Sequence, residues 1–229
     1  MILSKETMDI FHSFLSINEG IVVKPGKTLR IFSEAGDTFV RANVAEEFDQ
    51  EFAIYDLFQF ISIVNKLFKT PPTLDFKEKW VNISGKDSSC KYFYSDPSTI
   101  KYFNKDIEIK PEDVVLEFDI SNEQLNELRS AAGVVGLDVV KLSNTNGKLV
   151  ATLSLKEASK DNKFSLVIGD TDCTENFDLY LRSENLSLFK GDYKVRIARH
   201  DQILIFNAKN QNTDIEYFIS MGSDSKYEI

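Results

Sequence analysis

The sequence is short of the residues from which most catalytic and metal sites are built. Among its 229 residues there are two cysteines, two histidines and one tryptophan. Cys90 and Cys173 form no Cys-x-x-Cys pair, which excludes a zinc ribbon and fits a reducing compartment. The motifs Gly-x-Ser-x-Gly, Gly-x-x-x-x-Gly-Lys and Gly-x-Gly-x-x-Gly are absent from the sequence. We therefore expect a protein that is not an enzyme and that carries no cofactor and no metal.

Long apolar runs are also missing. The most apolar stretch, residues 53–68, is interrupted by Asp56 and Lys66. The opening residues lack a basic stretch followed by a long apolar run, so the sequence predicts neither a membrane span nor export. We expect the protein to stay in a cytoplasm.

Acidic residues are in excess, with 36 Asp and Glu against 27 Lys and Arg and a formal net charge of −9. Such a chain repels nucleic acid on average, so any contact with DNA has to be local. The apolar content of 42 % and the aromatic content of 12 % are typical of a soluble globular protein. The length suits two domains, each with its own core.

Apolar periodicity and capping residues predict the same order of elements in both halves of the chain. Helices are expected over residues 4–17, 57–68, 122–132 and 183–188, with antiparallel strands between them. Ser4, Asp56 and Ser121 are the predicted N-caps. The fold class is therefore α+β, with two helices on one face of an antiparallel sheet in each half. A loose segment, residues 95–113, predicts a linker between domains 1–94 and 114–229.

The polar face of the second predicted helix carries no carboxylate. Its core face is predicted to hold Leu57, Phe60, Ile61, Val64 and Leu67, and its other face holds Gln59, Ser62, Lys66 and Lys69. One interpretation is a solvated face that uses lysine for solubility. The other is a surface that approaches phosphates and therefore lacks Asp and Glu, which phosphates repel.

The remaining predicted helices have mixed polar faces. On the first, Lys5, Asp9, His12 and Ser16 share a face. On the third, Arg129 shares a face with Asn122 and Asn126, and Glu123 and Glu127 lie to one side. Arg182 and Lys190 bracket the fourth.

Several stretches in the same order along the chain carry a resemblance to a known family. They are LSKET, FHSFLSINEGIVVKPG, AIYDLFQFISIV, DPSTI, FSLVIGDTDCTENFDLYL and GDYKVRI. Together they resemble the sliding clamp, the DNA polymerase processivity factor, of T-even-like tailed phages. The similarity runs from Leu3 to the C-terminus.

This resemblance implies a homotrimeric ring with two similar clamp domains per subunit, each an antiparallel sheet with two helices on the inner face. The ring would enclose double-stranded DNA without sequence preference and tether a DNA polymerase, and an ATP-dependent clamp loader would open and close it. The implied location is the cytoplasm of the infected bacterial host.

On this basis the candidate DNA-facing residues are Lys5, His12, Lys66, Lys69, Arg129, Arg182 and Lys190. Asp9, Glu123 and Glu127 depart from an ideal DNA-facing set because phosphates repel carboxylates. A partner pocket implied by the family is expected near Ile107, Ile109, Phe218 and Ile219. The alternative is that these four are ordinary core residues of strands or linker.

Two other classes stay open at the level of sequence. A β-rich virion or adaptor protein that assembles through edge strands without binding DNA would share the acidity and the strands. A metal-dependent hydrolase could be built on Asp170 and Asp172 of the stretch GDTDCTEN, which also contains Glu175. That stretch lacks the central glycine and distal glutamate of an EF-hand, so a polar turn is the favoured interpretation.

Overall fold

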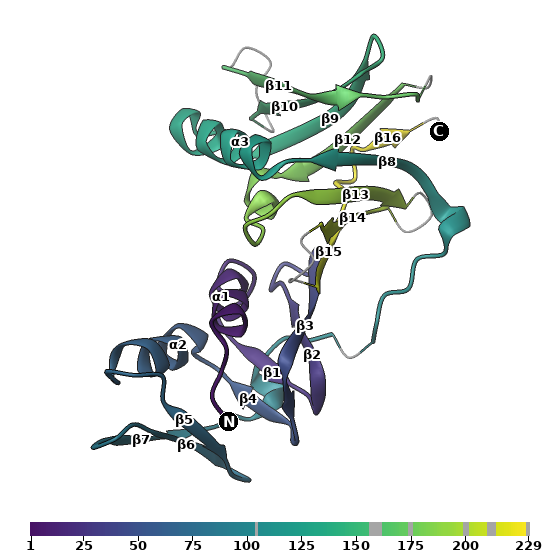
Figure 1. The fold of residues 1–229 in the computed structure, drawn as a ribbon. Coiled ribbons are helices and arrows are strands. Elements are labelled where there is room, and N and C mark those ends of the chain that lie inside the picture. The colour runs from purple at the N-terminus through teal and green to yellow at the C-terminus, as the bar shows by residue number, and fades with distance from the viewer. Residues whose placement is uncertain (104, 156–161, 174–175, 199–201, 210–213, 228–229) are drawn as a thin grey trace. The chain divides into compact units, whose positions relative to one another are not determined.

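The chain folds into two compact units. The computed structural model describes residues 1–103, 105–155, 162–173, 176–198, 202–209 and 214–227 (Figure 1). Unit 1 is Met1–Lys105 with the short segment Thr213–Ile215, and unit 2 is Asp106–Asn212 with Glu216–Ile229. The division between Lys105 and Asp106 falls inside the segment 95–113 that was predicted as a linker.

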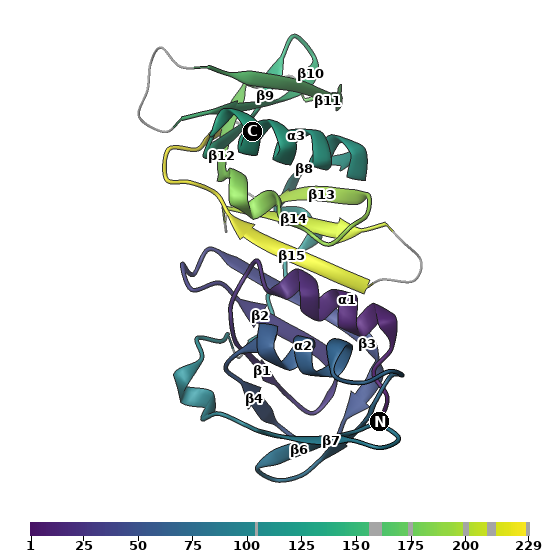
Figure 2. The same ribbon diagram turned by 90° about the vertical axis from the view of Figure 1, so that its left-hand side faces the viewer.

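Unit 1 combines two helices with short antiparallel sheets. Its described elements are α1 (Lys5–Phe14), β1 (Ile21–Val23), β2 (Gly26–Phe32), β3 (Thr38–Phe48), β4 (Phe52–Ile54), α2 (Leu57–Lys66), β5 (Thr73–Phe76), β6 (Trp80–Ser84) and β7 (Ser89–Phe93). β1 pairs with β4, β2 pairs with β3, and β5, β6 and β7 form a three-stranded sheet, all antiparallel. Figure 2 shows α1 and α2 side by side on one side of these strands.

Helix α1 begins where its capping residue predicts. The Ser4 side chain accepts a hydrogen bond from the Thr7 backbone N–H, which satisfies one of the free donors of the first turn. Its apolar face is buried at Met8, Ile10, Phe11 and Phe14. The helix ends at Phe14, three residues before the predicted end at Ile17.

Helix α2 is built in the same way. The Asp56 side chain accepts from the Gln59 backbone N–H at 2.7 Å, and the buried face consists of Leu57, Phe60, Ile61 and Val64. Leu67 was predicted on this core face, but it lies one residue beyond the helix and its side chain is 61 % exposed. The Pro71-Pro72 pair that follows cannot continue the helix.

The beginning of the chain completes one side of the three-stranded sheet. The Met1 ammonium donates to the Leu74 carbonyl at 2.9 Å, and the Leu74 N–H donates to the Met1 carbonyl at 2.7 Å. Leu74 belongs to β5, which lies at one side of the sheet order β5-β6-β7. The first residue therefore pairs with the side of β5 that faces away from β6.

The first part of the predicted linker packs on unit 1. The Ser95 N–H donates to the Ala53 carbonyl at 3.0 Å, and Asp96 caps a short 3-10 turn over Pro97–Thr99. Ile100 is buried in a cluster with Val22 and Ala53. These contacts explain why the compact unit extends past residue 94.

Unit 2 contains one long helix and two larger antiparallel sheets among its described residues. After a 3-10 turn at Pro111–Asp113, the elements are β8 (Val114–Ile120), α3 (Asn122–Val135), β9 (Val139–Thr145), β10 (Lys148–Ser154), β11 (Phe164–Asp170), β12 (Phe177–Arg182), β13 (Tyr193–Ala198), β14 (Ile203–Ala208), β15 (Asp214–Ser220) and β16 (Lys226–Tyr227). One sheet has the order β11-β10-β9-β12-β16, and β15, β14, β13 and β8 are neighbours in the other.

Helix α3 confirms its predicted start but not its predicted end. Ser121 and Gln124 form the capping box, with the Gln124 N–H on Ser121 Oγ and the Ser121 N–H on Gln124 Oε1. The helix continues through Gly133 and ends at Gly136, whose φ of 73° is the left-handed conformation that glycine adopts without strain.

The short helix predicted over residues 183–188 is instead a four-residue 3-10 turn, Ser183–Leu186. The Asn185 side chain accepts from the Arg182 N–H, and the Ser183 hydroxyl donates to the Leu137 carbonyl. Such a short segment gains too few helical hydrogen bonds to form an α-helix on its own, so these contacts determine its shape. The described part of unit 2 therefore has one α-helix on its sheets where two were expected.

The α+β class and the antiparallel sheets are confirmed. Within the described residues, no helix is long and apolar enough to cross a membrane.

Candidate nucleic-acid interface

The exposed face of α2 has no acidic side chain. Its exposed residues are Phe58, Gln59, Asn65 and Lys66, and the helix contains no Asp or Glu from Leu57 to Lys66. Asp56 precedes the helix and uses its carboxylate as the N-cap. In a chain with a net charge of −9, this face is a local exception to the acidic surface.

Lys66 is the last residue of this helix, Lys69 lies three residues beyond it, and both are exposed. The Lys66 ammonium lies 5.6 Å from the centroid of the Phe58 ring, a cation–π distance. Lysine in a last turn also interacts favourably with the helix dipole, so part of this pattern stabilises α2 itself. Lys69 has no ion pair to any described residue.

The α1 face is mixed, as its sequence indicates. Lys5 forms an ion pair with Asp9 over 2.6 Å, and the Lys5 side chain is 89 % exposed. His12 lies exposed in the last turn of the same helix. Because Asp9 already neutralises Lys5, this helix offers a weaker phosphate contact than α2 does.

The α3 face is more acidic than basic. Arg129 is half-buried, and its guanidinium donates a hydrogen bond to the Asn126 side chain. Glu123 and Glu127 are both exposed on this helix. Their carboxylates lower the local attraction for phosphates that Arg129 would supply.

The last two candidates flank the 3-10 turn of unit 2. Arg182, the final residue of β12, forms an ion pair with Glu184 over 2.6 Å. Lys190 is exposed and precedes β13. Both were predicted to bracket a helix, but the element between them is a 3-10 turn.

Of the four residues predicted for partner binding, two lie in the core. Phe218 and Ile219 belong to β15, pair with Ile205 and Leu204 of β14, and are only 3 % and 0 % exposed. Ile107 and Ile109 are half-buried. Only Ile107 and Ile109 therefore offer side-chain surface to a partner in this structure.

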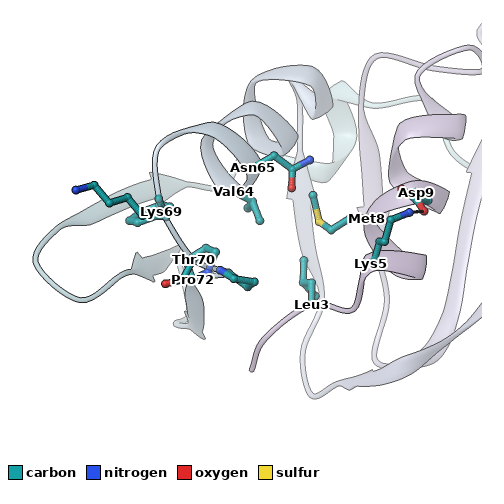
Figure 3. Close-up of a pocket in the computed structure, with 11 residues that line it drawn as sticks. Leu3, Lys5, Met8, Asp9, Val64, Asn65, Lys69, Thr70 and Pro72 are labelled. Atoms are coloured by element: carbon teal, nitrogen blue, oxygen red, sulfur yellow. Dashed lines mark hydrogen bonds and ion pairs between the residues drawn. The ribbon is translucent and has the colours of Figure 1, made fainter.

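A pocket of about 420 Å³ lies between α1 and the end of α2 (Figure 3). Its lining is Leu3, Lys5, Met8, Asp9, Val64, Asn65, Phe68, Lys69, Thr70, Pro71 and Pro72. It joins two of the candidate DNA-facing residues, Lys5 of α1 and Lys69 of the segment that follows α2. The sequence reasoning missed this pocket, although the double proline that turns the chain after α2 marks one of its walls.

Three contacts hold the walls of this pocket, which we call the unit 1 pocket. From β3, the half-buried Glu46 accepts hydrogen bonds from the Ser4 N–H and from the Thr7 hydroxyl, which anchors the start of α1. Burial raises the pKa of the Glu46 carboxyl, but these hydrogen bonds outweigh burial and leave the pKa below its ordinary value. Phe68 packs against Gly85 so closely that a Cβ at Gly85 would come within 2.8 Å of its ring.

The acidic stretch considered for a metal has a different arrangement. Asp170 forms an ion pair with Lys148, and Glu175 lies outside the described residues. In the described part of the chain, no group of three or more His, Cys, Asp or Glu side chains comes together.

Comparisons with known proteins agree with the fold and with the resemblance. A family model described as gp45 sliding clamp, C terminal, matches residues 117–223. The sliding clamp of Escherichia phage RB69 is 29 % identical over 233 residues, covering 100 % of both chains. The sliding clamp of Vibrio phage KVP40 is 30 % identical over 201 residues, covering 86 % of this chain and 90 % of that one.

Among solved structures, the proliferating cellular nuclear antigen of Entamoeba histolytica superimposes with a TM-score of 0.68. It covers 95 % of each chain at 13 % identity, which shows that the fold is shared. The prediction of two clamp-like domains per chain is therefore confirmed. With a shared fold and 30 % identity to a named relative over most of its length, the chain belongs to the sliding clamp family of T4-like phages.

Proposed function

We propose that this sliding clamp forms a closed, non-catalytic ring around duplex DNA and keeps a DNA polymerase on its template during phage replication. Family membership supports the ring, and the exposed face of α2 supports the contact with DNA. That face carries Lys66 and no acid in a chain with a net charge of −9. A surface that only has to stay soluble would not need to exclude carboxylates.

The proposed contacts are few and independent of sequence. Lysine is a flexible point charge that attracts phosphates without reading bases. Lys66, Lys69 and Lys190 are the best candidates, because none of them has an ion pair to another described residue. Lys5, Arg129 and Arg182 already have partners within their own unit and would have to exchange them for phosphate. His12 adds little, because it shares the mixed face of α1 with Asp9, whose carboxylate repels phosphate.

Weak contacts fit a protein that is retained by its closed shape. Each phosphate neutralised by a lysine adds affinity that depends on salt, and a large number of such contacts would slow sliding. A chain that is acidic overall, with one acid-free helix face, would contact phosphates at that face and would make too few contacts to stop sliding.

We further propose that three copies close the ring through strand edges. β7 pairs with β6 alone in the described part of unit 1, and β11 pairs with β10 alone in the described part of unit 2. Each edge exposes an apolar side chain, Phe93 at 63 % and Val167 at 54 %. Pairing β7 of one copy with β11 of the next would be a heterologous contact, which closes into a ring when the rotation permits.

The proposed partners follow from the family. A DNA polymerase would be tethered, and an ATP-dependent clamp loader would open the ring, both in the cytoplasm of the infected bacterial host. The half-buried Ile107 and Ile109 remain candidates for a partner contact.

Retention on a circle tests the proposal directly. The clamp is loaded on nicked circular duplex DNA with its loader and ATP, separated from free protein by gel filtration, and the DNA is then cut once. We expect the clamp to stay on the circle and to leave after linearisation. Equal retention on both forms would contradict topological binding, and no retention on the circle would favour an adaptor that does not enclose DNA.

A further inference from the structure

We infer that the unit 1 pocket binds an acidic peptide segment of a partner protein, which inserts one bulky apolar side chain between α1 and the end of α2. The inference rests on the lining of the pocket and on its charges. It requires neither the ring nor the DNA contact proposed above.

The floor of the pocket is apolar. Leu3 comes from the segment before α1, Met8 from α1 and Val64 from α2, and Figure 3 shows their side chains near one another. Phe68, Pro71 and Pro72 complete the apolar lining. A volume of about 420 Å³ lies in the range of pockets that enclose small ligands or large side chains.

Two lysines lie on opposite sides of this floor. In Figure 3, Lys5 lies on the α1 side, and Lys69 lies on the other side with its ammonium directed outward. Lys69 has no ion pair to any described residue, and Asp9 is the one acid in the lining. Because Asp9 pairs with Lys5, the net positive charge lies on the Lys69 side, and an occupant with an apolar centre and acidic residues next to Lys69 matches this order of charges.

Exposed apolar residues extend the patch beyond the pocket. Ile2 is 57 % exposed beside Leu3 in the chain, and Leu67 is 61 % exposed beside Phe68. An extended peptide places successive side chains about 3.3 Å apart along its length, so several of its residues could cover these neighbours as well.

The pocket exists before its occupant arrives. Glu46 fixes the start of α1, Gly85 receives Phe68, and the paired backbone groups of Met1 and Leu74 hold the segment before α1. A preformed site loses less conformational freedom on binding, so a short peptide can bind it with useful affinity.

The test uses the full-length protein and a fluorescein-labelled octapeptide, Asp-Glu-Asp-Leu-Phe-Glu-Asp-Glu. Control peptides replace Leu-Phe by Ser-Ser or all acidic residues by lysine. Fluorescence anisotropy is expected to show binding of the first peptide, with each control at least about tenfold weaker, a difference of about 1.4 kcal/mol. Binding of the lysine peptide as tightly as the acidic one would overturn the inference.

Matched variants locate the site. Asn65→Trp places a large ring at the pocket and should weaken binding about tenfold, whereas Gln59→Trp, on the same helix outside the lining, should not. Lys69→Glu should weaken binding several-fold more than Lys27→Glu, an exposed position elsewhere in unit 1. Equal effects within either pair would contradict this location, and circular dichroism checks that each variant is folded.

Methionine spectra give a second readout that does not depend on variants. The chain has three methionines, of which Met8 lines the pocket and Met221 does not. Titration of the acidic peptide into protein with ¹³C-methyl methionine should shift the Met8 resonance and leave Met221 unchanged. A peptide that binds without moving Met8 occupies another site. If duplex DNA shifts Met8 and the peptide does not, the pocket belongs to the DNA surface and the inference fails.

Discussion

Glu46 is the residue that joins the start of α1 to the neighbouring strand β3. Its carboxylate receives hydrogen bonds from Ser4 and Thr7 that lower its pKa despite partial burial. A group whose pKa is lower in the folded state stabilises that state above its unfolded pKa, about 4.3 for glutamate. This contribution is lost as the pH falls through the lower, folded pKa.

Glu46→Gln should therefore lower the free energy of unfolding at neutral pH by about 1 kcal/mol. The loss should shrink as the pH falls, because the wild-type carboxyl then becomes protonated and is uncharged, as the glutamine amide is at every pH. Urea unfolding followed by circular dichroism between about pH 7 and pH 3 measures this trend. Glu47→Gln, an exposed neighbour on β3, is the control. A loss of the same size at every pH would mean that the charge of Glu46 contributes nothing.

Lys66 and Lys69 allow a test of the DNA surface at the same scale. The double variant Lys66→Ala, Lys69→Ala should weaken binding to a short duplex and make the plot of log affinity against log salt shallower by up to about two units. Anisotropy from about 50 to 200 mM salt measures the slope. Lys27→Ala, Lys79→Ala is the matched control from exposed positions of unit 1. Identical slopes in the two double variants would exclude the end of α2 from the interface.

Residue-level prediction succeeds where the partner is near in sequence. Lys5 and Asp9 are four positions apart on a helix, and Arg129 and Asn126 are three apart, so their contacts follow from helical geometry. The contact of Phe68 with Gly85 joins two segments that no periodicity relates. Leu67 fits the apolar spacing of α2, but the helix ends one residue earlier, which leaves its side chain exposed.

At the scale of elements, helix starts were predicted better than helix ends. Ser4, Asp56 and Ser121 each accept a hydrogen bond from their own first turn, and such a bond needs only local sequence. The ends depend on packing, so α1 stops early and α3 continues past Gly133. The segment 183–188 was predicted as a short helix, but the Ser183 hydroxyl and N–H donate to the carbonyls of Leu137 and Asp138, and the segment forms a 3-10 turn.

The edge strands carry the prediction about assembly. Phe93→Asp in β7 or Val167→Asp in β11 should weaken the proposed trimer, because each puts a charge into the proposed apolar strand contact. The protein concentration at which trimer and monomer are equally populated should rise at least about tenfold. Sedimentation velocity at several micromolar concentrations measures the shift. Val134→Asp, at an 87 % exposed position of α3, is the control. An unchanged trimer in both edge variants would place the subunit contact elsewhere.

At the scale of the whole molecule, salt should act in opposite directions on assembly and on DNA binding. Subunits with a net charge of −9 repel one another, and salt screens this repulsion over about 10 Å at 0.1 M. The trimer should therefore form at lower concentration in about 300 mM than in about 50 mM salt, whereas contact with duplex DNA weakens. Sedimentation equilibrium and anisotropy on the same samples measure both trends. A trimer that weakens with salt would mean that ion pairs, and not apolar edges, dominate the contact.

The two-domain architecture was accessible from sequence because each half begins with a capped helix or a strand followed by one, and continues with alternating strands. The unit 1 pocket was not, since its walls come from residues 3–9 and 64–72 and depend on Glu46 and Gly85, which lie elsewhere in the chain. Local patterns could mark the lysines at its sides, but only the folded chain brings them together around an apolar floor.

The pairing of Met1 with Leu74 has a consequence for the direction in which the three-stranded sheet can grow. Both backbone groups of Leu74 that face away from β6 are already bonded to Met1, so an incoming strand meets a blocked margin there. At the opposite margin, β7 pairs with no second strand among the described residues. The three-stranded sheet can therefore add a strand at one margin only. Copies of this sheet cannot stack edge to edge into a continuous fibril through both of their margins.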